Sequence, residues 1–135
     1  MKEITVLADT SRLEEVQQFI RGELKGGYCD EKTLFQLDLV VEEIFVNISH
    51  YAYEEKKDEA TITCEIKDNP RTIIIKFIDS GKEYNPFVRE DPDITLDAKS
   101  RQIGGLGVFI TKKMVDSLDY FYKDGKNCLI LKKII

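Results

Sequence analysis

The chain has 135 residues, 42% of them hydrophobic and 33% charged, which suffices for one buried core and predicts a single domain over residues 1–135. Its 25 Asp and Glu residues outnumber its 20 Lys and Arg residues, a balance that argues against binding along a nucleic-acid backbone. The sequence has neither a secretory signal nor the run of about 20 apolar residues that spans a membrane, so we expect a cytoplasmic protein without membrane partners.

The first third of the chain predicts one short strand and two helices. Residues 4–7 are predicted as a strand, and the hydroxyls at 10–11 can cap a helix that the glycines at 26–27 end. Asp30 is a good N-cap for a second helix, because apolar residues follow it at helical spacing as far as about Ala52. This second helix is the longest predicted element.

The middle of the chain predicts a β-hairpin. The charged run 54–59 is typical of a solvated turn, and apolar and polar residues alternate over 60–67, which predicts a strand with one buried face. Residues 68–71 carry turn-forming side chains, and 72–79 follows as an apolar run of strand length. We therefore expect the two strands to pair.

The last third predicts a long loop, a helix and a second hairpin. Residues 80–103 have no regular period and are too many for a simple connection, which favours a functional lid. A helix is predicted to open at Gly104 and run to about Ser117, and residues 118–123 and 128–134 are predicted to pair as a hairpin. Together the elements predict an α/β (α+β) fold: a two-layer sandwich with a mostly antiparallel mixed sheet and three helices on one face.

The long second helix carries a polar pair on an apolar flank. Glu43 and Asn47 lie one turn apart, with apolar side chains on both sides of them. A carboxylate among apolar side chains has a raised proton affinity, which suits a general base, and an amide oxygen one turn away can help to hold a divalent cation. The alternative interpretation is an exposed Glu and a polar Asn near a helix end.

Asp79 lies at the end of the strand predicted over 72–79, on the same face as the apolar residues of that strand. Gly81 follows two residues later, so the backbone can turn sharply and approach a planar ligand. The carboxylate can then accept a hydrogen bond from an amino group of that ligand. The alternative is an ordinary turn at a strand end.

A glycine cluster and two lid cations are candidates for binding phosphate. Gly104, Gly105 and Gly107 precede a predicted helix, where unhindered backbone N–H groups and the positive end of the helix dipole favour an anion. The lid also carries Lys99 and Arg101, and either side chain could contact a γ-phosphate when the lid closes. Arg101 is the nearer of the two to the glycines. A plain glycine turn with solvated charges is the alternative.

The order of these motifs resembles the GHKL family of ATP-binding domains, which is named after gyrase, an Hsp chaperone, histidine kinases and a mismatch-repair protein. The chain has Glu-x-x-x-Asn on a helix, Asp-x-Gly after a buried strand, and Gly-Gly-Leu-Gly before a helix. Within that family it is similar to the short anti-sigma-factor serine kinases. The similar segments are 42–47, 51–53, 79–87, 91–96 and 103–107. The resemblance covers nearly the whole chain and implies the GHKL (Bergerat) fold.

The resemblance also implies a role for each candidate residue. Glu43 matches the catalytic base, Asn47 the magnesium ligand and Asp79 the acid that binds adenine. Gly81 matches the turn beneath the base, and the glycines of 104–107 match those that cradle the phosphates. ATP and Mg²⁺ are therefore the implied cofactors.

Three positions depart from the family pattern. Glu83 stands where many members have a second glycine, and Tyr51 stands where some have His. Lys126 and Asn127 lie near the position at which others carry a Thr that supports the adenine pocket.

The function that the resemblance implies is an ATP- and Mg²⁺-dependent serine/threonine kinase and anti-sigma factor that acts on a small antagonist protein. A sigma factor as a second partner and a homodimer stay open. Two other functions also stay open: a nucleotide-gated protein-binding module with little catalysis, and a detached catalytic domain of the histidine-kinase kind.

Overall fold

The structure is a computed structural model that describes residues 1–25, 27, 29–86 and 111–135. The greater part of the predicted lid and the start of the predicted third helix lie outside the described residues.

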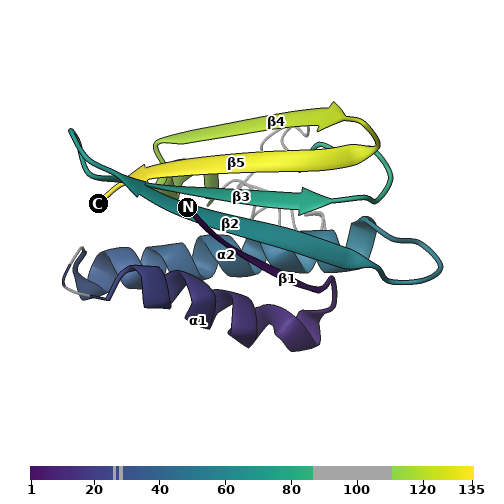
Figure 1. Ribbon diagram of the computed structural model, residues 1–135, viewed down its shortest axis with the longest axis horizontal. Coiled ribbons are helices and arrows are strands. Elements are labelled where there is room, and N and C mark those ends of the chain that lie inside the picture. The colour runs from purple at the N-terminus through teal and green to yellow at the C-terminus, as the bar shows by residue number, and fades with distance from the viewer. Residues whose placement is uncertain (26, 28, 87–110) are drawn as a thin grey trace, which may run out of the picture.

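The described strands form one sheet in the order β1-β2-β3-β5-β4 (Figure 1). The bounds of the strands are β1 (Lys2–Leu7), β2 (Glu59–Lys67), β3 (Thr72–Asp79), β4 (Ser117–Lys123) and β5 (Lys126–Ile134). All four pairings between described neighbours are antiparallel, as expected for most of the sheet. Strand β3 is central, so both of its edges are hydrogen-bonded.

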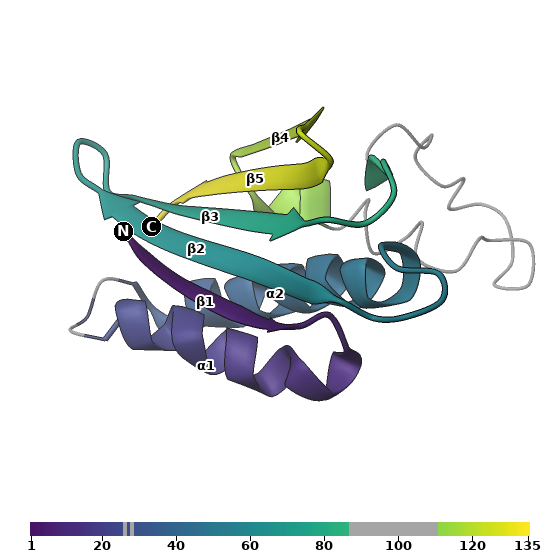
Figure 2. The ribbon, with the colours of Figure 1, turned by 45° about the vertical axis from the view of Figure 1, so that its right-hand side comes forward.

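Two helices, α1 (Leu13–Glu23) and α2 (Glu31–Tyr51), cover one face of the sheet (Figure 2). Helix α2 begins as predicted, because the Asp30 side chain accepts a hydrogen bond from the N–H of Thr33 at 2.8 Å. This arrangement confirms the predicted two-layer α/β architecture with helices on one face.

The start of the first helix differs from the prediction. The hydroxyls at 10–11 do not provide the cap; the carboxylate of Asp9 accepts from the N–H of Ser11 at 3.0 Å, and the first turn is a 3-10 helix over Thr10–Arg12. An Asp side chain reaches the N–H two residues ahead easily, so it satisfies a donor that the hydroxyls were expected to take.

The helix predicted to run to about Ser117 ends earlier. Residues 111–114 are helical, and Ser117 is already the first residue of β4. The N–H of Asp116 donates to the carbonyl of Lys132 at 2.9 Å, so pairing with β5 begins there and competes with a further helical turn.

Both predicted hairpins are confirmed. The β4–β5 connection has only two residues, Asp124 and Gly125, with φ of 54° and 75°. Two positive φ angles make the turn that matches the twist of paired strands, which explains a glycine there.

The core lies between the sheet and the helices. Along β3, Ile73, Ile75 and Phe77 are at most 1% exposed and face α2, where Phe45 is fully buried. Asp79 continues the same alternation and is 5% exposed. The period of the strand therefore sets a carboxylate at the end of an apolar row, as predicted.

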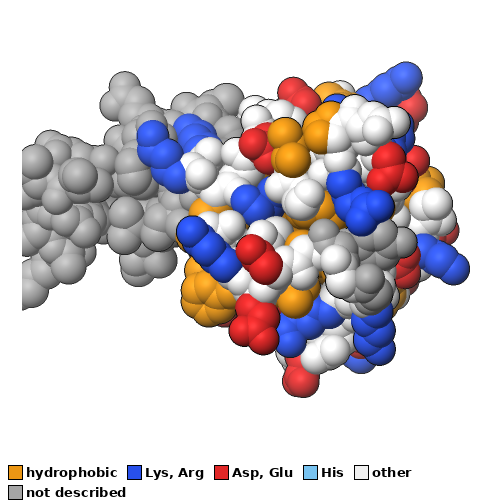
Figure 3. Space-filling model, turned by 90° about the vertical axis from the view of Figure 1, so that its left-hand side faces the viewer, with side chains coloured by type: hydrophobic (Ala, Val, Ile, Leu, Met, Phe, Trp, Pro, Cys, Tyr) orange, Lys and Arg blue, Asp and Glu red, His pale blue; other side chains and the backbone are white. Residues whose placement is uncertain are grey.

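Charges of both signs are mixed on the surface. On the end of the molecule shown in Figure 3, Lys and Arg side chains alternate with Asp and Glu, so this face carries no basic stripe of the kind that follows a phosphate backbone. Among the described residues, no helix is long and apolar enough to cross a membrane.

Candidate functional site

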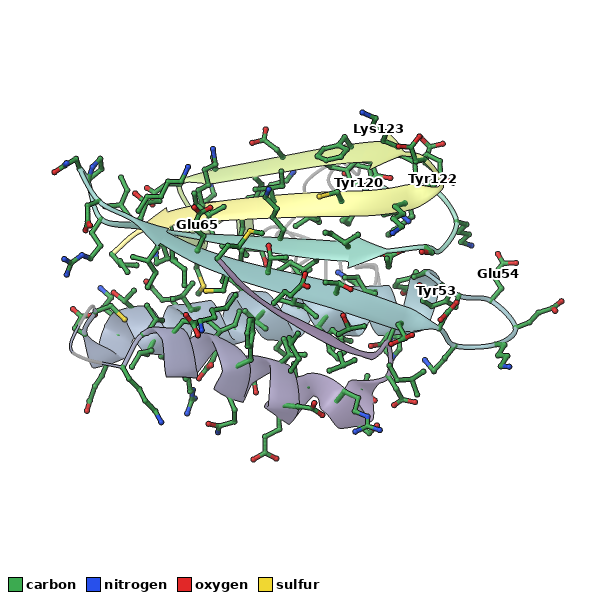
Figure 4. The ribbon with its side chains drawn as sticks, in the orientation of Figure 1. Tyr53, Glu54, Glu65, Tyr120, Tyr122 and Lys123 are labelled. Atoms are coloured by element: carbon green, nitrogen blue, oxygen red, sulfur yellow. The ribbon has the colours of Figure 1, made fainter. Side chains whose placement is uncertain are left out.

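A pocket lies between α2 and the sheet, where the last residue of β3 and the first residues of β5 face the C-terminal half of the helix. Glu43, Asn47 and Asp79 all line it, together with Asn127 and Tyr120. The structure thus brings together three of the residues that the sequence analysis singled out, from a helix and a strand that are far apart in the chain. Tyr53 and Tyr120 lie toward this end of the sheet (Figure 4).

The α2 wall of the pocket carries the polar pair. The side-chain amide of Asn47 donates to Oε1 of Glu43, with 3.4 Å between nitrogen and oxygen. Burial raises the pKa of Glu43, as does the charge of nearby Glu42, against the opposing effect of the Asn47 bond. A carboxylate in this state takes up a proton more readily than an exposed Glu, and the Asn47 oxygen is a ligand type that Mg²⁺ accepts.

The sheet wall of the pocket carries Asp79. Its Oδ1 accepts two hydrogen bonds, from the N–H of Gly81 and from the side-chain amide of Asn127, both at 2.9 Å. Burial raises the pKa of Asp79, while these two bonds act in the opposite direction. The carboxylate is therefore held in one orientation at the rim of the core.

Gly81 packs against the C-terminal end of α2. A Cβ atom at this position would lie 2.1 Å from the carbonyl oxygen of Ala52 and 2.6 Å from its carbonyl carbon, distances that no real side chain occupies. The next residue, Lys82, donates its N–H to the same oxygen at 3.1 Å. Glycine is thus required for a close approach between the strand end and the helix end, which brings Asp79 near α2.

Two tyrosines at the C-terminal end of α2 support this contact between helix and strand. The hydroxyl of Tyr53 donates to the carbonyl of Glu59 at 2.7 Å and accepts from the N–H of Ser80 at 2.9 Å. The ring of Tyr51 lies 5.7 Å from that of Tyr84, centroid to centroid. Both tyrosines therefore pack at the end of the helix.

Asn127 lies near the family position at which a Thr supports the adenine pocket, but its contacts with Asp79 were not predicted. Besides its bond to Asp79, its amide nitrogen donates to the carbonyl of Lys82 at 2.8 Å, and its oxygen accepts from the N–H of Tyr84 at 3.1 Å and from the Tyr120 hydroxyl. Asn127 is directly opposite Asp79 in the β3–β5 register. Only the strand order could have revealed this pair, because nothing local in the sequence indicates that β3 and β5 are neighbours.

A second cavity lies between α2 and residues 111–114. It is lined by the apolar side chains of Leu39, Val46 and Met114. Glu43 and Thr111 line both cavities. Glu43 therefore borders both cavities, one of which Asp79 also lines.

The remaining predicted site residues, Arg101, Gly104, Gly105 and Gly107, lie outside the described residues.

Comparison with known proteins points to one family. Residues 6–133 match the model of the histidine kinase-like ATPase domain. The chain is 26% identical over 114 residues to the serine-protein kinase RsbW of Listeria monocytogenes, covering 82% of this chain and 71% of the relative. The serine-protein kinase RsbW of Listeria innocua is 24% identical over the same shares of the two chains.

Solved structures share the fold. A chain of the SiaB–SiaC complex from Pseudomonas aeruginosa superposes with a TM-score of 0.58 and 16% identity, covering 98% of this chain and 89% of that one. The histidine kinase AdeS of Acinetobacter baumannii gives a TM-score of 0.54 at 15% identity, over 99% of this chain and 68% of that one. At such identities the likeness concerns the fold alone.

Proposed function

The chain belongs to the histidine kinase-like ATPase family, and from this premise we propose that it is an ATP- and Mg²⁺-dependent serine/threonine kinase that regulates a partner protein. In this proposal it acts as an anti-sigma factor and phosphorylates a small antagonist protein, as the resemblance of its motifs to the anti-sigma-factor serine kinases implies. The relatives named serine-protein kinase support the kinase part of the proposal. The observation that carries the proposal is that Glu43 borders both cavities, because the base must reach the acceptor hydroxyl at the point where that hydroxyl meets the nucleotide.

The nucleotide would occupy the pocket between α2 and the sheet. Asp79 would accept a hydrogen bond from the amino group of adenine, and its low exposure would make that bond selective. Asn47 would hold Mg²⁺ through its amide oxygen, and the ion would supply positive charge to the phosphate oxygens when bound. The Gly104–Gly107 motif and Arg101 belong to the same proposal as phosphate-binding residues.

The acceptor hydroxyl would enter from the second cavity. Its oxygen would bond to the γ-phosphorus while the bond to the ADP oxygen breaks, and Glu43 would take up the hydroxyl proton. The raised pKa of Glu43 supports this role, because a base with a higher pKa holds the transferred proton better. The apolar lining by Leu39, Val46 and Met114 would help to exclude water from the reacting groups.

Calorimetry with Mg²⁺ and ADP tests the nucleotide part of the proposal. We expect the wild-type protein to bind ADP and Asp79→Asn to weaken binding by about tenfold or more, because a charge-assisted hydrogen bond is lost. Asp119→Asn, which changes an exposed carboxylate on β4, is the matched control and should bind as the wild type does. Absence of wild-type binding at millimolar ADP would refute the proposal.

A further inference from the structure

We propose that Asn127 positions the Asp79 carboxylate as a hydrogen-bond acceptor and thereby sets the preference of the pocket for adenine over guanine nucleotides. This inference rests on the nucleotide-binding function proposed above and assigns its base specificity to a residue of β5.

The orientation of the Asn127 amide is fixed by its neighbours. Its nitrogen lies 2.8 Å from the carbonyl oxygen of Lys82 and 2.9 Å from Oδ1 of Asp79, and its oxygen lies 3.1 Å from the backbone nitrogen of Tyr84. Rotating the amide by half a turn would set oxygen against oxygen and N–H against N–H at all three contacts. The side chain can therefore adopt only one of its two orientations.

Asn127 uses its full hydrogen-bonding capacity within the protein. A side-chain amide has two N–H donors, which go to Asp79 and to the carbonyl of Lys82, with a longer contact of 3.4 Å to the carbonyl of Gly81. Its two acceptor sites take the Tyr84 N–H and the Tyr120 hydroxyl. No capacity is left for a direct bond to a nucleotide base. Asn127 consequently acts on a ligand through Asp79, as a positioning residue.

The bonds to Asp79 determine which oxygen a ligand meets. Oδ1 accepts from the amide of Asn127 and from the N–H of Gly81, each at 2.9 Å. Two donors fill the two lone-pair directions of a carboxylate oxygen, so Oδ2 is the oxygen that can accept from a base in the pocket that Asp79 lines.

An acceptor at this point discriminates between the purines. Adenine carries an amino group at the position where guanine carries a carbonyl oxygen, so an ionised carboxylate attracts the first and repels the second. A protonated carboxyl group could donate to the guanine oxygen instead. The selectivity therefore depends on Asp79 remaining ionised.

Asn127 and Gly81 are the groups that favour the ionised form. Burial raises the pKa of Asp79 and their hydrogen bonds lower it, with the Asn127 bond the larger of the two. The other titratable groups that line the pocket are Glu43 on α2, Lys82 and Tyr84 after β3, and Tyr120 on β4. Tyr53 lies nearby, and burial raises the pKa values of the Tyr53 and Tyr120 hydroxyls, which stay neutral. Without Asn127, Asp79 would take up a proton at a higher pH.

Calorimetry with ADP and with GDP, each with Mg²⁺, at about pH 6 and about pH 8 tests the proposal. We expect the wild type to prefer ADP at both pH values. Asn127→Ala should lose about tenfold or more in ADP affinity at the lower pH, less at the higher pH, and its ratio of ADP to GDP affinity should narrow as the pH falls. Melting temperatures measured at both pH values identify the folded preparations.

Tyr120→Phe is the second variant, because it removes one bond to the Asn127 oxygen and keeps the ring. Tyr120→Phe should shift the pH dependence of ADP affinity in the same direction as Asn127→Ala, by a smaller amount. If Asn127→Ala does not fold, Tyr120→Phe is the variant that tests the proposal. Tyr122→Phe, on the same strand and 40% exposed, should leave both affinities unchanged.

Three results would overturn the inference. In the first, Asn127→Ala has the wild-type pH dependence and the wild-type ratio of ADP to GDP affinity. In the second, it loses affinity equally for both nucleotides at both pH values, which would mean a structural role only. In the third, the wild type fails to bind ADP, and the proposed function then fails together with the inference.

Discussion

The buried carboxylate of Asp79 lowers the stability of the fold, and it is held in one orientation as a hydrogen-bond acceptor. Its pKa is raised in the folded protein, mainly by burial, so the folded chain holds a proton there to a higher pH than the unfolded chain does. The free energy of unfolding must therefore decrease as the pH rises from the ordinary Asp pKa through the raised one. A carboxylate with only a structural role would be expected to stabilise the fold instead.

Asp79→Asn should separate binding from stability. A neutral amide can still accept from Gly81 and Asn127 with its oxygen and carries no desolvation cost, so the variant should melt no lower than the wild type at about pH 7 in the absence of nucleotide. Thermal unfolding followed by circular dichroism measures this. A clearly lower melting temperature for Asp79→Asn would indicate that the charge stabilises the fold.

The elements around the site join at the contact between the end of β3 and the end of α2. Helix α2 contributes buried residues such as Val41 and Phe45 on one side and Glu43 and Asn47 on the flank that faces the pocket. Gly81 sets the distance between this flank and the strand, because its Cα lies against the carbonyl of Ala52.

Gly81→Ala should therefore disturb both stability and binding. The added methyl group would force the strand end away from α2, so we expect a melting temperature lower by several degrees and weaker ADP binding. Gly22→Ala is the matched control, because a Cβ there meets nothing within 4 Å and the residue lies inside α1, where Ala is favoured over Gly by about 0.5–1 kcal/mol. Equal melting temperatures for Gly81→Ala and the wild type would contradict this account of the contact.

Local sequence patterns predicted the helices and strands themselves better than they predicted which of these elements lie side by side. Alternation predicted β2, an apolar run of strand length predicted β3, and turn residues predicted both hairpins, because these signals act over a few adjacent residues. The bond between Asn127 and Asp79 joins residues 48 positions apart and depends on the strand order β3-β5, for which the sequence carries no local signal. The helix end near Ser117 was also missed, since pairing with β5 decides it.

At the scale of the whole molecule, one pocket lies between the two layers and a second cavity lies between α2 and residues 111–114. The family and the fold support a nucleotide in the pocket that Asp79 lines, and the second cavity supports an acceptor beside it. Because Glu43 lines both, we propose that this carboxylate takes the proton from the acceptor hydroxyl.

Phosphate transfer by Glu43→Gln tests that claim most directly, with labelled ATP, Mg²⁺ and a candidate antagonist protein as acceptor. The substitution keeps the shape of the side chain and removes the proton acceptor, so transfer should fall by about a hundredfold or more while ATP affinity and melting temperature stay close to wild type. Glu14→Gln, which changes an exposed carboxylate on α1 that lines neither cavity, is the matched control and should transfer normally. If wild type shows no transfer although ATP promotes capture of the acceptor, the protein is a nucleotide-gated binding module; if Glu43→Gln transfers phosphate at the wild-type rate, Glu43 is not the base.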